Sequence, residues 1–219
     1  MRRLSGIHLY KRFFIDFSLN DFRDYSKIVE QQFKDSLQKF EKEASELTPD
    51  EQEEYFDHYY DEWSPFKNDF PKIHRSSLFI SIYSFLESAL INLCKRSYGK
   101  YHLSSTYEDI SGNGIERAKI YLTKVAEIDF PSNTKEWQFI KLCNDIRNCI
   151  VHNQSYLNSD SKKAEKLENQ LKKTPLINVD VSGEITIEEG FCNLFIDTLE
   201  SFLNKLFTIV GEKDKQMVR

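Results

Sequence analysis

The chain has 219 residues, of which 40% are hydrophobic and 30% charged, enough for one sizeable folded domain. With only 7 glycines and 5 prolines it lacks the turn residues that a β-sandwich needs, so mostly helical structure is expected. The net charge of −5 argues against a protein that coats nucleic acid nonspecifically, although a local basic cleft could still bind RNA.

The N-terminal third predicts a helical extension. Residues 1–16 mix basic and aromatic side chains and could form a strand, an arm or a packed extension. A long helix is predicted from about Leu19 to Leu47, where apolar residues recur at three- and four-residue steps. A second helix is expected to begin at Thr48 and Pro49, residue types that favour the N-cap and the first helical position. Pro65 and Pro71 bracket a predicted connector.

The middle of the chain predicts a buried helix followed by two shorter ones. Apolar residues from about Lys72 to Arg96 wrap nearly all the way round, which is typical of a helix buried on most sides, and Gly99 is its predicted stop signal. Two further helices are expected over about 115–126 and 134–153, with a break at Pro131 between them.

The last part of the chain predicts a short exposed helix within residues 159–173 and a small β-hairpin around Ser182 and Gly183. A final amphipathic helix is expected from about Phe191 to Val210, followed by a frayed tail. The fold class predicted is therefore all-α: a helical bundle with a small β-hairpin before the last helix. Residues 1–68 are assigned to the extension and residues 69–211 to the bundle, in a single compact domain overall.

The cysteines and the N-terminus indicate where the protein resides. The four cysteines lie in apolar contexts without a paired CxxC, which indicates buried free thiols in a reducing cytoplasm: Cys94, Cys143, Cys149 and Cys192. The N-terminus has no long apolar core, and no uninterrupted apolar run approaches about 18 residues. Neither a signal peptide nor a membrane span is expected.

The stretch CNDIRNCIVHNQSY, residues 143–156, places Arg147, Asn148 and His152 near the end of a half-buried helix. At about 100° per residue, the apolar residues of this helix form one stripe and the polar ones occupy the remaining arc. Asn148 and His152 are four residues apart and can touch, and the long Arg147 side chain can reach a phosphate held over Asn148. The alternative is a solvated helix end, where basic side chains interact with the last carbonyls.

These three side chains suit RNA cleavage without a metal ion. Histidine is the side chain that titrates near neutral pH, so His152 can accept the proton of a 2′-hydroxyl or return one to the leaving 5′-oxygen. Arg147 offers donors to the charge that builds on the phosphate, and Asn148 can orient the imidazole or the phosphate. Because one histidine cannot easily act as acid and base in one turnover, two copies of the helix facing each other in a dimer are expected.

The run from Arg147 to His152 resembles the R-x4-6-H motif of HEPN-domain proteins, in the spacing written RNxxxH. The mostly buried helix upstream is also similar to that family. The resemblance implies a HEPN-like bundle and a metal-independent endoribonuclease of toxin–antitoxin or antiphage defence. It further implies RNA as substrate, no cofactor and a composite site at a homodimer interface. A cognate antitoxin or defence-system protein would be a further partner. In one subgroup an antitoxin modifies a tyrosine two residues after the histidine; here Gln154 stands there.

Other residues complete this prediction. Glu87 lies in an apolar run, where a carboxylate is costly unless paired; a buried Glu87 could pair with Arg147 and support its guanidinium. The alternatives are an exposed strip, or a pair with Arg75 or Lys95. Asn144, Arg75 and Tyr156 are candidates for contact with the substrate, and no metal ligands are predicted. The rival hypothesis for the whole chain is a noncatalytic HEPN module that binds RNA, a nucleotide or a protein partner.

Overall fold

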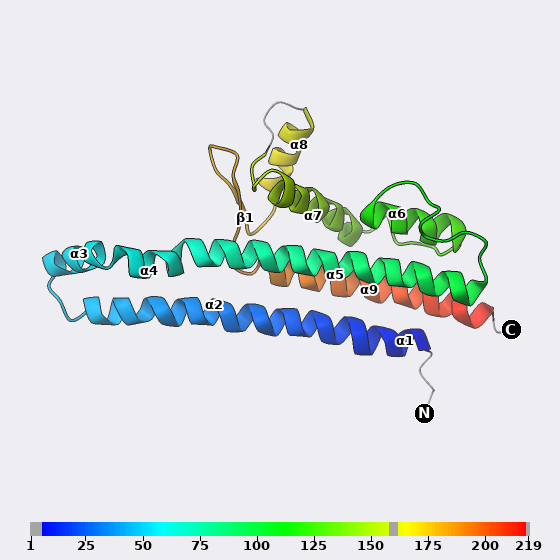
Figure 1. The fold of residues 1–219 in the computed structure, drawn as a ribbon, viewed down its shortest axis with the longest axis horizontal. Coiled ribbons are helices and arrows are strands. Elements are labelled where there is room, and N and C mark those ends of the chain that lie inside the picture. Colours follow the sequence, from blue (N-terminus) through cyan, green and yellow to red (C-terminus); the bar gives the residue numbers. More distant parts are fainter. Residues whose placement is uncertain (1–5, 158–161, 218–219) are drawn as a thin grey trace. The chain divides into compact units, whose positions relative to one another are not determined.

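The computed structural model describes residues 6–157 and 162–217, and most of them are helical (Figure 1). The helices are α1 (Gly6–Tyr10), the π-helical segment η1 (Lys11–Asp16), α2 (Phe17–Ala44), α3 (Pro49–His58), α4 (Tyr60–Lys67), α5 (Asp69–Tyr101), α6 (Gly114–Ile120), the π-helical segment η2 (Tyr121–Val125), α7 (Lys135–His152), α8 (Lys162–Leu171) and α9 (Phe191–Gln216). Strands β1 (Ile177–Val179) and β2 (Ile185–Ile187) pair antiparallel before α9. The predicted mostly helical class with a small hairpin before the last helix is confirmed.

Packing divides the chain into two compact units, whose boundaries fall inside α2, α5, α7 and α9. Unit 1 consists of the chain up to Asp21, the segment Ser81–Arg147 and the chain from Leu194 onward. Unit 2 consists of the segments Phe22–Ile80 and Asn148–Asn193. The division into an extension of residues 1–68 and a bundle of residues 69–211 stays a prediction.

In unit 1, the C-terminal part of α5 runs beside α9 (Figure 1). Aromatic side chains form the core next to them, where the buried Trp137 ring stacks on Phe202 at 5.3 Å and meets Phe130 edge-on at 4.8 Å. Such pairs add about 0.5–1.5 kcal/mol each to the stabilisation from apolar burial. Unit 1 also includes α1 and η1, so residues 6–16 form a packed helical extension, with Ile7 and Ile15 buried.

The final helix is longer than predicted, because its last turns are tied to α5. The expectation of an end near Val210 and a frayed tail is wrong: α9 continues to Gln216, and Asp214 is only 4% exposed. Its carboxylate accepts hydrogen bonds from Arg96 Nη2 at 2.6 Å and Tyr101 Oη at 2.8 Å, and lies 2.8 Å from Lys100 Nζ. These bonds to a distant part of the chain order a segment that lacks strong helical signals of its own.

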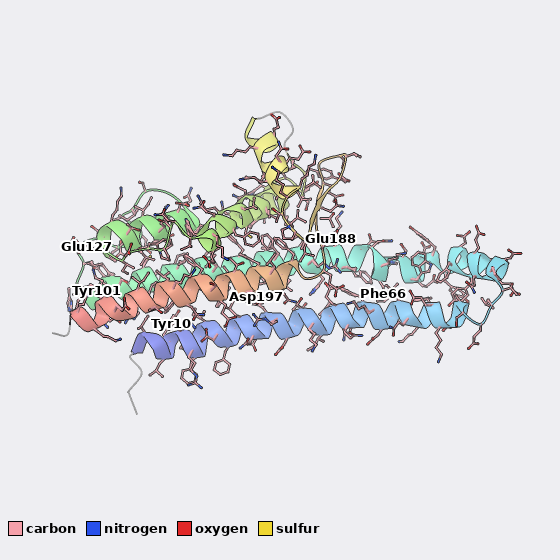
Figure 2. The ribbon with its side chains drawn as sticks, turned by 180° about the vertical axis from the view of Figure 1, so that it is seen from behind. Tyr10, Phe66, Tyr101, Glu127, Glu188 and Asp197 are labelled. Carbon is pink, nitrogen blue, oxygen red and sulfur yellow. The ribbon has the colours of Figure 1, made fainter. Side chains whose placement is uncertain are left out.

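The same contacts explain why α5 does not stop at Gly99. It runs on to Tyr101, and the left-handed residue after it is His102, with φ of 51°. Glycine costs about 1 kcal/mol in a helix relative to alanine, and the bonds from Lys100 and Tyr101 to Asp214 outweigh that cost. Figure 2 labels Tyr101 at the C-terminal end of α5, and Glu127 in the segment after η2.

In unit 2, α3 begins as predicted: Glu51 Oε2 accepts hydrogen bonds from the Thr48 N–H and hydroxyl, at 2.9 and 2.7 Å. The predicted connector between Pro65 and Pro71 is wrong, because Pro65 lies inside α4 and Pro71 in the first turn of α5. A proline is tolerated in a first turn, where its missing N–H would have no partner. The interruption is confined to Asn68, whose side chain donates to Ser64 Oγ at 3.0 Å.

One helical stretch among the described residues, Tyr60–Tyr101, is long and apolar enough by length and composition to cross a membrane. Half of the window that meets this test is buried within the protein, and the core helix of a soluble protein meets the same test. The absence of a membrane span and the cytoplasmic location therefore stay predictions.

Candidate active site at the end of helix α7

Helix α7 begins with a side-chain cap, and its part within unit 1 has a buried stripe. The Trp137 N–H donates to Thr134 Oγ1 at 3.3 Å, and the Thr134 hydroxyl donates to the Pro131 carbonyl at 3.0 Å. The buried stripe consists of Trp137, Ile140, Cys143 and Ile146. Cys143 and Ile146 are buried as predicted, whereas the rest of the helix from Lys141 to Ile150, apart from Cys149, is half-buried, Asn144 and Arg147 included.

Tyr83 of α5 lies against this polar side of α7. Its hydroxyl donates to Asn144 Oδ1 at 2.7 Å, and the Arg147 guanidinium carbon lies 5.9 Å from its ring centroid. Burial raises the pKa of Tyr83, and the nearby Glu87 carboxylate raises it further. The hydroxyl therefore remains protonated at neutral pH and acts as a hydrogen-bond donor. Tyr83 contacts both Asn144 and Arg147, two of the residues singled out from the sequence.

Glu87, one turn after Tyr83, does not form the expected pair with Arg147. Within the described part of the chain its carboxylate makes no ion pair. Its Oε1 lies instead 2.6 Å from the position that a Cβ on Gly114 would occupy, at the start of α6. Gly114 has φ of +52°, a conformation that strains a residue with a side chain, and the N–H groups of a helix start favour a nearby carboxylate.

The chain turns sharply immediately after His152, the last residue of α7. Gln154 and Ser155 both have positive φ, at 52° and 71°, conformations that cost a non-glycine residue about 1 kcal/mol or more. Backbone hydrogen bonds offset this cost: the Ser155 N–H donates to the Cys149 carbonyl at 3.1 Å, and the Ser155 carbonyl accepts from the Ile185 N–H at 2.8 Å. The turn is thereby fixed to strand β2.

His152 is exposed at this helix end, and its imidazole makes no hydrogen bond or ion pair with the residues that the structure describes. Because α7 is continuous from Lys135 to His152, helical geometry alone fixes the spacing of Arg147, Asn148 and His152. Asn148 is half-buried on the same helix. The imidazole has the backbone rigidity and the solvent access that a proton-transfer group requires.

Two further candidates for substrate contact have different surroundings. Arg75 is held by Glu30 in a two-bond ion pair of 2.7 and 2.8 Å, which raises the pKa of Arg75. Its guanidinium thus has a structural partner within unit 2. Tyr156 is 43% exposed and forms an isolated backbone bridge with Glu184, so its ring is accessible beside the turn that follows His152.

The described residues include four cysteines and further side chains of the types that bind metal ions. In the described ranges 6–157 and 162–217, no group of three or more His, Cys, Asp or Glu side chains could hold a metal ion. All four cysteines are free and buried, as predicted, and burial raises the pKa of Cys94 and of Cys192 to about 12. These two thiols are protonated at neutral pH and are poor nucleophiles.

Comparisons with models of known protein families, with curated proteins and with solved structures find no match for this chain. The residue that the sequence analysis missed is Tyr83. The signal was present, since Tyr83 and Glu87 stand one turn apart in an otherwise apolar run, and a buried hydroxyl requires a hydrogen-bond partner as a carboxylate does.

Proposed function

We propose that this protein is a metal-independent endoribonuclease of the HEPN type, with a composite site that two copies of helix α7 form in a homodimer. The observation that carries the proposal is the exposed His152 imidazole, which ends the helix that bears Arg147 and has no partner among the described residues. An exposed imidazole that makes no hydrogen bond or ion pair with the described residues is free to contact a substrate.

The reaction is a transesterification in which no metal is needed. The imidazole of one His152 accepts the proton of the ribose 2′-hydroxyl as the 2′-oxygen attacks the neighbouring phosphorus. The bond from phosphorus to the 5′-oxygen then breaks, and His152 of the second copy donates a proton to that oxygen. The products are a 2′,3′-cyclic phosphate and a 5′-hydroxyl. Arg147 stabilises the charge on the phosphate oxygens, and Asn148 orients the imidazole or the phosphate.

Tyr83 and Glu87 have supporting roles in this proposal. The Tyr83 ring limits the positions available to the Arg147 guanidinium, and its hydroxyl fixes the Asn144 amide one turn away. Glu87 contributes negative charge next to Tyr83 and contacts the start of α6. The setting that we propose is a bacterial toxin or antiphage effector in the cytoplasm, with an antitoxin or another defence protein as regulator.

A noncatalytic HEPN module that binds RNA, a nucleotide or a protein is the second candidate. It is favoured by the position of Arg147 over the buried Tyr83 ring, since an arginine that only stabilises the fold makes the same contact. In that case α7 would serve as a binding or dimer surface, and the motif would carry no chemistry.

Cleavage of mixed RNA in EDTA separates the two candidates. Wild type is compared with Arg147→Ala and His152→Ala, and with His58→Ala, which removes another exposed histidine from α3. If the protein is the proposed endoribonuclease, wild type and His58→Ala should cleave RNA in EDTA. The cleavage rate should be at least about 100-fold lower in Arg147→Ala and in His152→Ala. Equal activity in all four proteins, or cleavage that EDTA abolishes, would contradict the proposal.

A further inference from the structure

Unit 2 contains a polar cleft of about 350 Å³ between one face of α2 and the turn that leads into α9. Arg23, Ser26, Lys27 and Lys34 line it from α2, and Gly190 and Asn193 line it from the other side. A cleft of this size lies at the lower end of the range for small-molecule sites. It is separate from the residues assigned to RNA cleavage.

The two carboxylates at this cleft are already neutralised by cations of the protein. Both oxygens of Glu30 accept hydrogen bonds from Arg75, and Glu189 accepts one from Lys34 at 2.6 Å. Lys27 is exposed and makes no ion pair with the residues that the structure describes. The charge that remains uncompensated in the cleft is therefore positive.

Two polar side chains at the cleft make no hydrogen bond within the described part of the chain. Ser26 is only 6% exposed, and its hydroxyl makes no hydrogen bond within the described part of the chain. The Asn193 side chain on the opposite wall also has a buried oxygen without a hydrogen bond. Buried polar groups are nearly always satisfied, so the Asn193 amide lacks a partner among the described residues, and the Ser26 hydroxyl, whose oxygen is not fully enclosed, is open to a ligand in the cleft.

The start of α9 adds backbone donors. Gly190 has φ of +92°, which only glycine adopts readily, and this conformation leads directly into the first residue of α9, Phe191. The N–H groups of Cys192 and Asn193 lie in the first turn of this 26-residue helix, where no helical acceptor exists. The partial positive charge of a helix start favours an anion there.

We propose that this cleft binds a phosphate group, with the Lys27 ammonium, the Ser26 hydroxyl and the first-turn N–H groups of α9 as donors. The Lys27 ammonium and the Ser26 hydroxyl can donate to an anion with several acceptor oxygens, and the Asn193 amide can do so after rotation of its side chain. The volume leaves room beside the phosphate for a small organic group, so a phosphate monoester fits as well as the free ion.

Calorimetric titration of the full-length protein with inorganic phosphate and, in a second arm, with ribose 5-phosphate tests this proposal. Lys27→Gln and Ser26→Ala should each weaken binding about tenfold, the loss expected for one hydrogen bond to a charged group. Lys39→Gln removes an exposed lysine from the same helix outside the cleft and should leave affinity unchanged. Tighter binding of the ester than of the ion would identify a monoester as the source of the phosphate, and the reverse would identify the free ion.

Three outcomes would overturn the proposal: no saturable binding to wild type, equal affinity in Ser26→Ala and wild type, or loss of binding in Arg147→Ala. The last result would assign the phosphate to helix α7 instead. The melting temperature of each variant is measured in parallel, and Ser26→Ala, which removes a single oxygen, is expected to fold like wild type. His152→Ala should bind phosphate with the affinity of wild type. The result of the binding experiment is therefore independent of whether the protein is a ribonuclease.

Discussion

Two groups of polar side chains in this protein lie near the ends of helices, and they differ in whether the chain itself completes them. Around Asp214 of α9, Arg96, Lys100 and Tyr101 converge on one buried carboxylate. At the end of α7, the exposed His152 makes no such contact with the described residues. The Asp214 carboxylate is bound within the chain and has a structural role, whereas an exposed imidazole at a helix end is available to a substrate or a second chain.

This difference shows why charged residues near a helix end are weak indicators of chemistry. The tail that contains Asp214 and the helix that contains His152 are both polar in sequence, and only their surroundings separate a structural cluster from a candidate site. Burial raises the pKa of Asp214, but hydrogen bonds from Lys100, Arg96 and Tyr101 outweigh it and hold the pKa below its usual range.

The largest effect on stability is expected from Asp214→Ala. The substitution leaves Arg96, Lys100 and Tyr101 without their shared acceptor, and the free energy of unfolding should fall by about 2–3 kcal/mol. The loss stays below that of a fully buried ion pair, because Arg96 and Lys100 are partly exposed. Urea unfolding measures it. Glu212→Ala, an exposed acid on the same helix, should change stability by less than about 0.5 kcal/mol. Equal stability of both variants would show that the Asp214 cluster contributes nothing.

A smaller effect is expected from Tyr83→Phe, which removes the hydrogen bond to Asn144 and keeps the ring beside Arg147. Stability should fall by about 1 kcal/mol. If the Asn144 contact helps to position the α7 residues, kcat for RNA cleavage should fall severalfold with little change in KM. Tyr121→Phe is the matched control, because this buried hydroxyl donates to the Ser105 carbonyl at 2.9 Å. The control should lose similar stability and keep kcat. Equal kcat in both variants would mean that Tyr83 has no positioning role.

The smallest effect concerns acid stability. Hydrogen bonds from Lys205, from backbone and from Ser201 lower the pKa of Glu136 from 4.5 to about 2. A carboxylate whose pKa is lower in the folded than in the unfolded protein stabilises the fold at pH values above its pKa in the unfolded protein. This contribution is lost as the pH falls through its pKa in the folded protein. The melting temperature of wild type should therefore decrease more steeply between pH 5 and about pH 2 than that of Glu136→Gln. Parallel curves for the two proteins would contradict this role.

Much of the fold could be predicted from sequence because local signals are strong where apolar residues recur at helical spacing. Thr48 and Pro49 set the start of α3, and Gly183, with φ of +82°, lies in the hairpin turn as expected. The errors arose where distant contacts override local preference. Gly99 lies inside α5, and the tail lies inside α9, because both segments meet at Asp214.

The helix that carries the candidate site could be predicted from the sequence, but the contacts that support the site could not. The spacing of Arg147, Asn148 and His152 follows from helical geometry alone. The position of Glu87 does not, since its carboxylate lies against Gly114 of α6, a contact that no periodic pattern encodes. The Tyr83 hydrogen bond to Asn144 likewise depends on how α5 packs on α7 within unit 1.

Mixing wild type with His152→Ala tests most directly whether two copies of the chain share one site. The two proteins are combined at increasing proportions, allowed to exchange subunits, and assayed for RNA cleavage in EDTA at constant total concentration. If each site needs both histidines, mixed dimers are inactive and activity follows the square of the wild-type fraction, reaching about a quarter at equal mixing. A linear fall, to about a half at equal mixing, would contradict a shared site at the end of α7.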